Sequence, residues 1–551
     1  MNVIFIMNDT LRQDHLGCYG NEWIKTPNLD RLAESSMVFD RAYIASHATL
    51  PARTDLYTGM YTFLYRGWSP LHPRDVILPE IIGEHGYASM FIFDTTPMGQ
   101  DNYNYMRGFT GWEMIRGHHE DRWKTDPTVP IVWPAAPHKL KNLNRTIQYM
   151  RNKADWRYEK DYVAPRTFAT AIEWLERNHT WDGFLLWIDT WDPHEPFDPP
   201  AHYLKLYADP EYDGDQIIYP QYGRSAYMTE DELKHVKALY AGEVTMVDRW
   251  IGHLLDKVEQ LGLLDNTLII HTSDHGHLFG EHDLHGKPGG LVGPLYEVTT
   301  RLPLIIRHPE GLGAEKRIPA IVQPPDLLPT ILEFLDVPAP DTVQGRSLWP
   351  LISGEVVKLH DYAFSGRFPR CLAGAAVTGT SETVITYDGF VGPGDVAEDI
   401  TVTDEQWSLI LGPRGRPSEL YNLKNDPDQN ENVIADNLDL AVKMQQALAE
   451  FMREYGGSQA LIDIYSPTRK EMVAPMADSA KKLKAEDLLY VMHDQRGTPI
   501  AFLSEEDAAK RCACQSGELD LEVRSFGWLH GRDPRHLIYM DGQFHWAQDL
   551  G

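Results

Sequence analysis

Cysteine is scarce in this chain. Among 551 residues only four are cysteines, and they form neither a CxxC pair nor the spacing of a zinc site: Cys18, Cys371, Cys512 and Cys514. So few thiols exclude a disulfide framework and fit a reducing compartment. The Cys512-Ala-Cys514 segment could bind a metal or sense redox state, but two incidental thiols are the simpler interpretation.

Long hydrophobic runs are also missing. No stretch reaches the roughly 18 apolar residues that a membrane-spanning helix needs. The first apolar run, residues 3–7, follows Met1 almost directly, without the basic region or the small-residue cleavage site of a secretion signal. We therefore expect a cytoplasmic protein with no membrane partner.

Positive charge is in deficit. The chain has 51 Lys and Arg against 80 Asp and Glu, a formal net charge of −29. Such a surface repels nucleic acid, so we expect no nucleic-acid partner. An anionic substrate would need a locally positive site, and a bound metal ion is the simplest way to make one. The composition is compatible with a monomer and with a homo-oligomer.

Apolar runs bounded by polar residues predict the strands of a buried sheet. Five such runs occur in the first part of the chain: residues 3–7, 88–93, 184–188, 267–270 and 304–306. The clearest helix spans residues 230–260, where Thr229 and Glu232 form a capping box and apolar residues recur at helical spacing. This alternation predicts an α/β domain with a mostly parallel sheet and helices on both faces.

The character of the sequence changes near residue 355. Short strand-like runs at residues 383–387 and 407–411, separated by Gly and Pro, predict a small antiparallel sheet, and residues 438–455 have the pattern of an amphipathic helix. We therefore expect a large α/β domain that carries the site, a small α+β subdomain and a C-terminal extension with a charged helical pattern at residues 478–489. Their expected bounds are 1–360, 361–456 and 457–551.

Polar residues follow four of the predicted strands. Asp9 follows the first, Asp94 the second, residues 189–194 the third, and Asp274 with His275 the fourth. Ligands of parallel sheets bind at the carboxyl ends of the strands, so these residues should converge on one edge. The two carboxylates and the imidazole of Asp9, Asp274 and His275 can hold one divalent cation. The imidazole favours Mn²⁺ or Zn²⁺ over Ca²⁺ or Mg²⁺.

The segment at residues 46–59, Ser-His-Ala-Thr-Leu-Pro-Ala-Arg-Thr-Asp-Leu-Tyr-Thr-Gly, resembles the signature of the sulfatase family. That signature begins with Cys-x-Pro-x-Arg and ends with Leu-x-Thr-Gly. Thr49 falls on the cysteine, and the other signature positions are in register: Pro51, Arg53, Leu56, Thr58 and Gly59.

The resemblance covers residues 1 to about 455. Further segments match the family in order: residues 9–20, 26–33, 192–197, 273–287, 301–307, 345–348 and 419–427. The family belongs to the alkaline phosphatase superfamily. The resemblance therefore implies an alkaline-phosphatase-like α/β fold, a bound divalent metal ion and hydrolysis of a small anionic ester.

The resemblance also implies roles for individual residues. Asp9, Asp274 and His275 would hold the metal ion together with Thr49. Thr49 would be the nucleophile, and Arg53 would stabilise and orient it. An ion pair at the start of a helix is the alternative interpretation of Arg53.

Other matched residues would contact the substrate. His194 and Lys287 would bind the transferred group, and either could protonate the leaving oxygen. His282 would bind substrate or orient Lys287 or a metal ligand. Where many sulfatases carry a Lys and a His after the second strand, this chain has Asp94 and Thr96. Asp94 could hold a substrate amine or a second metal, or simply cap a turn.

Two departures from the family pattern bear on the reaction. Thr10 takes the place of a second aspartate, which is also missing in the phosphonate monoester hydrolases of the superfamily. Thr49 cannot be converted to formylglycine, as the sulfatase cysteine is, so we expect no formylglycine. A metal-activated threonine hydroxyl can attack phosphorus, and water can hydrolyse the resulting ester, whereas a threonine sulfate has no elimination route. We therefore expect phosphodiester or phosphonate hydrolysis through Thr49. The alternatives are a sulfuric ester hydrolase and a catalytically inactive anion-binding protein.

The segment at residues 107–123 is rich in aromatic and basic side chains. It follows the predicted strand at residues 88–93. Two interpretations are equally supported: the segment lines the substrate pocket, or it packs as an ordinary loop.

Overall fold

The structure is a computed structural model. It describes residues 1–100, 102–287, 294–369, 398–474, 490–493, 499–502, 537–540 and 543–546. The predicted strand at 383–387, the helical pattern at 478–489 and the cysteines at 371, 512 and 514 lie outside these residues. Within the described ranges, no helix is long and apolar enough to cross a membrane.

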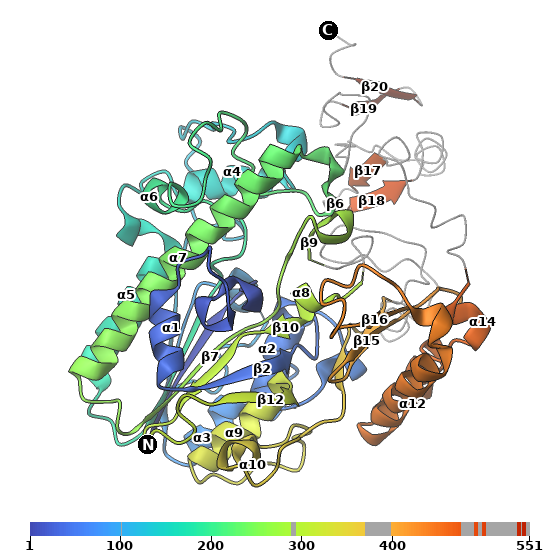
Figure 1. The fold of residues 1–551 in the computed structure, drawn as a ribbon. Coiled ribbons are helices and arrows are strands. Elements are labelled where there is room, and N and C mark those ends of the chain that lie inside the picture. Colours follow the sequence, from blue (N-terminus) through green and yellow to red (C-terminus); the bar gives the residue numbers. More distant parts are fainter. Residues whose placement is uncertain are drawn as a thin grey trace.

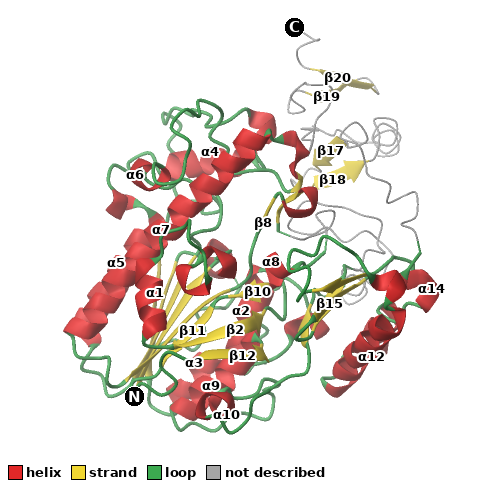
Figure 2. Cartoon of the chain, viewed as in Figure 1, coloured by secondary structure: helices red, strands yellow, loops and turns green. Residues whose placement is uncertain are grey.

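A nine-stranded sheet forms the centre of the large domain (Figures 1 and 2). Its strands lie in the order β10-β2-β11-β7-β1-β5-β3-β4, and β12 pairs with β2. Their bounds are Asn2–Asn8 (β1), Met37–Tyr43 (β2), Ala88–Phe93 (β3), Gly111–Met114 (β4), Phe184–Thr190 (β5), Thr267–Ser273 (β7), Arg301–Leu302 (β10), Leu304–Arg307 (β11) and Arg317–Val322 (β12). From β7 to β4 all neighbours are parallel, which confirms the predicted mostly parallel sheet.

All five predicted strands belong to this sheet, but β11 runs antiparallel to both β7 and β2. The sequence patterns do not predict β2, β4, β10 and β12. In β2, Asp40 and Arg41 interrupt the apolar run. Strand β4 is short and lies at the sheet edge, so its side chains need not be apolar.

Helices cover both faces of the sheet (Figure 1). Along β1, Ile4 and Ile6 pack in a core shared with α5 and α7, whereas Val3, Phe5 and Met7 pack with α2, α3 and α9. A strand whose alternate residues enter two apolar cores must be buried on both sides. The helices of this domain are α1 (Pro27–Glu34), α2 (Thr49–Thr58), α3 (Leu78–Glu84), α4 (Leu143–Asn152), α5 (Val163–Asn178), α6 (Ala201–Leu204), α7 (Glu230–Gln260), α8 (Glu297–Thr300), α9 (Leu327–Phe334) and α10 (Trp349–Ser353).

Helix α7 has the predicted bounds and the predicted capping box. The Thr229 hydroxyl accepts a hydrogen bond from the backbone N–H of Glu232 at 3.2 Å, and the Glu232 carboxylate accepts one from the backbone N–H of Thr229 at 2.9 Å. The two bonds satisfy N–H groups that a helix start leaves without partners.

A second, antiparallel sheet of four strands follows the large domain, as predicted. Its strands are β13 (Ala363–Ser365), β14 (Ile400–Thr403), β15 (Trp407–Leu411) and β16 (Glu419–Asn422). Helix α12 (Leu438–Glu454) packs on it through Met444 and Leu448. The remaining elements are short: β6 (Gly223–Arg224), β8 (Leu278–Phe279), β9 (Leu284–Gly286), α13 (Gln459–Ile464), α14 (Arg469–Met472), and the hairpins β17 (Tyr490–His493) with β18 (Pro499–Phe502) and β19 (Leu537–Met540) with β20 (Gln543–Trp546).

Candidate active site

The three predicted metal ligands from the strand ends come together. Strands β1 and β7 pair in parallel, so Asp9, which follows β1, lies beside Asp274 and His275, which follow β7. One ligand atom from each of these residues lies within 4.8 Å of the other two. His275 Nε2 is 3.8 Å from Asp9 Oδ1 and 3.5 Å from Asp274 Oδ2. All three side chains are buried.

Hydrogen bonds from Thr10 orient both carboxylates. Its backbone N–H donates to Asp274 Oδ1 at 2.9 Å, and its hydroxyl donates to Asp9 Oδ1 at 2.7 Å. The backbone N–H of His275 also donates to Asp274 Oδ1, at 2.8 Å. The residue that replaces the second aspartate of many sulfatases therefore positions the remaining acidic residues.

The donor atoms of this cluster suit a divalent ion. His275 Nδ1 donates to the carbonyl of Gly276 at 2.9 Å, so the Nε2 lone pair is available to a metal. Neither His275 Nε2 nor Asp9 Oδ2 has a hydrogen-bond partner, although both are buried. Burial and the charge of Asp274 raise the pKa of Asp9 to about 6, and burial lowers the pKa of His275 to about 3. A cation between these groups would relieve both the repulsion and the missing bonds.

Arg53 links helix α2 to this cluster through a buried guanidinium group. Its Nε and Nη2 donate to the two oxygens of Asp189 at 2.9 and 2.7 Å. Its Nη1 donates to Asp274 Oδ2 at 2.6 Å and lies 3.3 Å from Asp9 Oδ2. The Thr95 hydroxyl also donates to Asp189 Oδ1, at 2.6 Å. Asp189 and Thr95 were assigned no role from the sequence, although both lie at the strand ends where the site was expected.

Thr49 is the first residue of α2 and is 4% exposed. Its backbone carbonyl accepts a hydrogen bond from Arg53 Nη1 at 3.1 Å. The guanidinium that contacts Asp274 and Asp9 thus also contacts the main chain of the candidate nucleophile. A helix N-terminus carries partial positive charge and favours bound anions. The roles of Thr49 as nucleophile and metal ligand stay predictions.

His194 lies in the loop after β5 and presents a neutral imidazole. Its Nδ1 donates to the carbonyl of Glu195 at 2.5 Å, because a carbonyl can only accept. Burial and the charge of Lys287 hold the pKa of His194 well below its usual value. In this form Nε2 carries a lone pair that can accept a hydrogen bond, and the low pKa makes the ring a weak base.

Lys287 stands between the metal cluster and a second acidic group. Its Nζ lies 3.8 Å from Asp9 Oδ1 and 3.7 Å from Glu195 Oε2, and its side chain is 7% exposed. Glu195 was not predicted as a site residue from the sequence. One sequence feature could have identified it: Glu195 is a charged residue between His194 and a proline, in a segment that follows a buried strand.

Part of the aromatic and basic segment at 107–123 lies against the site. The His119 ring stacks on His194 with 5.6 Å between centroids, and the His118 ring stacks on Trp191 at 4.8 Å. By contrast, Trp112 on the edge strand β4 is 52% exposed. The segment therefore combines a part that packs beside the site with a part that faces solvent.

Asp94 and Thr96 make structural contacts after β3. The Asp94 carboxylate accepts hydrogen bonds from the Thr167 hydroxyl at 2.6 Å and from the backbone N–H of Trp191 at 2.5 Å. Burial and the charge of Asp192 raise the pKa of Asp94 to about 7. The Thr96 hydroxyl lies 3.4 Å from the Asp94 carbonyl. Both predicted substrate contacts stay predictions.

His282 packs toward the small antiparallel sheet. Its ring stacks on Tyr296 with 3.7 Å between centroids. The Tyr296 hydroxyl donates to Glu419 of β16 at 3.2 Å. This stacking gives His282 a packing contact with Tyr296. Its predicted substrate contact stays a prediction.

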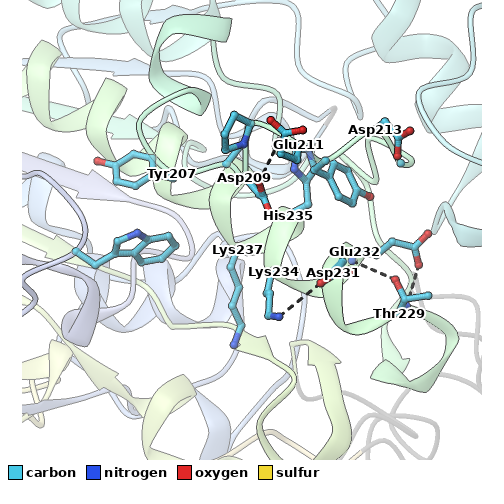
Figure 3. Close-up of a pocket in the computed structure, with 15 residues that line it drawn as sticks. Tyr207, Asp209, Glu211, Asp213, Thr229, Asp231, Glu232, Lys234, His235 and Lys237 are labelled. Atoms are coloured by element: carbon cyan, nitrogen blue, oxygen red, sulfur yellow. Dashed lines mark hydrogen bonds and ion pairs between the residues drawn. The ribbon is translucent and has the colours of Figure 1, made fainter.

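A separate cavity of about 690 Å³ lies between the loop at residues 207–214 and the start of α7 (Figure 3). Its lining includes five acidic residues: Asp209, Glu211, Asp213, Asp231 and Glu232. None of the predicted site residues lines it. Its negative charge makes it unsuited to an anionic ester, which the cluster around Arg53 and Lys287 fits better.

Known proteins with similar sequences and folds point to one family. The model of the family described as Sulfatase matches residues 1–337. The sulfatase YidJ of Escherichia coli (strain K12) is 28% identical over 475 residues, covering 82% of this chain and 87% of its own. An arylsulfatase of Clostridium perfringens (strain 13 / Type A) is 27% identical over 481 residues, covering 79% of this chain and 90% of its own. The crystal structure of the phosphonate monoester hydrolase of Agrobacterium radiobacter aligns with a TM-score of 0.64 at 23% identity, covering 82% of this chain and 96% of that one.

The sheet, with its acidic and basic groups gathered at the strand ends, has the same fold as the Agrobacterium hydrolase. The chain belongs to the sulfatase family of ester hydrolases, whose family model covers more than half of its length. Enzymes of this family are metal-dependent, and the cluster of Asp9, Asp274 and His275 is the candidate site for the ion.

Proposed function

We propose that this hydrolase cleaves monoanionic phosphorus esters, which are either phosphodiesters or phosphonate monoesters. In this proposal Thr49 is the nucleophile and Mn²⁺ or Zn²⁺ is the metal ion. The observation that carries the proposal is a threonine at the start of α2, hydrogen-bonded through its carbonyl to the arginine that contacts Asp9 and Asp274. The structurally similar protein of Agrobacterium radiobacter is a phosphonate monoester hydrolase.

In this proposal Thr49 Oγ1 attacks phosphorus and loses its proton while the bond to the leaving oxygen breaks. His194 Nε2 accepts this proton, because an anionic substrate bound beside it raises the pKa of the imidazole. Lys287 donates a proton to the leaving oxygen. A water molecule then attacks phosphorus in the Thr49 ester and gives a proton to the neutral Lys287 amine, while the bond to Oγ1 breaks and His194 returns its proton to Oγ1. A divalent ion at Asp9, Asp274 and His275 would lower the pKa of a hydroxyl and stabilise charge on the phosphoryl group.

Sulfuric ester hydrolysis is the second candidate. It is favoured by the names of the curated relatives, which include an arylsulfatase. The chemistry counts against it, because a threonine sulfate has no elimination route and would turn over slowly.

A panel of matched p-nitrophenyl esters tests the proposal. Metal-loaded protein would be assayed on the sulfate, the phosphate, a phosphodiester and a phosphonate. We expect turnover of the phosphodiester or the phosphonate, its loss in Thr49→Ala and its retention in Thr49→Ser, which keeps the hydroxyl. Acid-quenched enzyme should carry on Thr49 the alkyl phosphoryl group of the diester or the phosphonyl group of the phosphonate. Phosphoester turnover that survives Thr49→Ala, or turnover of the sulfate ester alone, would refute the proposal.

A further inference from the structure

Glu195 is a buried carboxylate held between two lysines. Its side chain is fully buried, with Oε2 at 3.7 Å from Lys287 Nζ and Oε1 at 3.7 Å from Lys141 Nζ. Oε1 also accepts a hydrogen bond from the Tyr222 hydroxyl. The Lys141 ammonium in turn lies over the Tyr222 ring, 3.3 Å from its centroid.

This carboxylate belongs to the substrate side of the site. Lys287 reaches both Glu195 Oε2 at 3.7 Å and Asp9 Oδ1 at 3.8 Å, so one ammonium connects Glu195 to the metal cluster. His194 Nδ1 lies 3.4 Å from Glu195 Oε2. Both residues expected to bind the transferred group therefore have Glu195 as a neighbour. A low-dielectric site transmits its charge more strongly than water would.

The charges around the site nearly balance. Buried Arg53 and Lys287, together with Lys141, which is 21% exposed, face the four buried carboxylates of Asp9, Asp189, Asp274 and Glu195. The side chains alone sum to one negative charge, and a divalent ion brings the total to one positive charge. A monoanionic group neutralises that excess. A dianionic group leaves an uncompensated negative charge in a buried site, which is costly.

We propose that Glu195 is a specificity-determining residue that makes the site reject dianionic groups in favour of monoanionic ones. The inference deepens the proposed function and rests on it for the identity of the site. Glu195 is the carboxylate of the four that neither contacts Arg53 nor belongs to the metal cluster. Its negative charge can therefore act on the substrate through Lys287 and His194 without a share in holding the metal ion.

The first experiment compares substrates that differ in charge. Values of kcat/KM for p-nitrophenyl phosphate, a dianion at pH 8, are divided by those for its methyl diester, a monoanion. We expect this ratio to rise tenfold or more in Glu195→Gln, which keeps the shape and removes the charge. Lys141→Gln removes a compensating cation and should lower the ratio. The matched control is Glu297→Gln, a buried glutamate paired with Arg301, which should leave it unchanged.

A binding experiment separates this inference from the nucleophile assignment. Sulfate and methanesulfonate have similar shapes and carry two charges and one charge respectively. Their dissociation constants for metal-loaded protein would be measured by calorimetry. Tighter sulfate binding by tenfold or more in Glu195→Gln, with methanesulfonate less affected, supports the inference even where no phosphoester is turned over. Equal ratios in the parent, Glu195→Gln and Lys141→Gln overturn it. If Glu195→Gln does not fold, the ratio in Lys141→Gln decides alone.

Discussion

Arg53 and Asp189 form a buried two-point ion pair, with Nε to Oδ2 at 2.9 Å and Nη2 to Oδ1 at 2.7 Å. Neither side chain is exposed to solvent. The pair ties the second turn of α2 to the carboxyl end of β5. It leaves Nη1 free to reach Asp274 and the carbonyl of Thr49. The Arg53 guanidinium, held in place by Asp189, therefore positions both the candidate nucleophile and the metal cluster.

Asp189→Asn should destabilise the protein and lower turnover. Removing one charge leaves the Arg53 guanidinium buried and partly uncompensated, at a cost of about 3–5 kcal/mol. We expect turnover to fall by at least tenfold, because Nη1 loses its fixed direction. Chemical denaturation and steady-state kinetics would measure the two effects.

The control for Asp189→Asn is Asp256→Asn. Asp256 pairs with Arg31 at 2.7 Å, but both side chains are about half exposed. An exposed pair of this kind contributes about 1 kcal/mol or less. If both variants lose the same stability, the buried pair has no special role.

Removal of the metal should lower the thermal unfolding temperature. A ligand that binds only the folded protein stabilises it by about 2.7 kcal/mol at a hundredfold excess over Kd. Chelator-treated protein should therefore unfold at a lower temperature than protein supplied with Mn²⁺ or Zn²⁺. Asp9→Asn removes the charge of a carboxylate whose Oδ2 atom has no hydrogen-bond partner. This change should abolish the rise in unfolding temperature on adding metal. A gain that persists in this variant would place the ion elsewhere.

Much of the fold is encoded locally. The strands at β1, β3, β5 and β7 are continuous apolar runs, and the bounds of α7 follow from its capping box and periodicity. The antiparallel direction of β11 is different. It depends on its pairing with β2, a strand whose apolar pattern is broken by Asp40 and Arg41. The pairing of two strands that are distant in sequence cannot be predicted from the pattern of either strand alone.

In the candidate site, too, some residues could be predicted from the sequence and others could not. Asp9, Asp274 and His275 follow strand ends, so topology alone brings them together. The roles of Asp189 and Glu195 depend on side chains from α2 and from the segment after β9, which are distant in sequence. His282 was predicted from its motif position, but its observed partner is Tyr296.

Thr229→Ala should loosen the first turn of α7. Loss of a threonine N-cap costs about 1 kcal/mol, because the N–H of Glu232 loses its acceptor. We expect faster hydrogen exchange at the first amides of the helix and unchanged exchange in its middle. Thr229→Ser, which keeps the cap, is the control. Slower or unchanged exchange at the first turn in Thr229→Ala would contradict the cap assignment.

Glu120 should stabilise the protein in a pH-dependent way. Its buried carboxylate pairs with Arg145 and lies 3.7 Å from His119 Nε2. Burial alone would raise the pKa of Glu120, but Arg145 and His119 together lower it from 4.5 to about 2. A pKa that is lower in the folded state means that folding favours the ionised form. The stabilisation is therefore complete above pH 4.5 and is lost as the pH falls toward 2, and a shift of this size corresponds to roughly 3 kcal/mol.

Glu120→Gln should lose that amount at pH 7, and its unfolding free energy should approach that of the parent as the solution is acidified. A difference between the two proteins that stays constant from pH 7 to pH 3.5 would show that the charge of Glu120 is not its source.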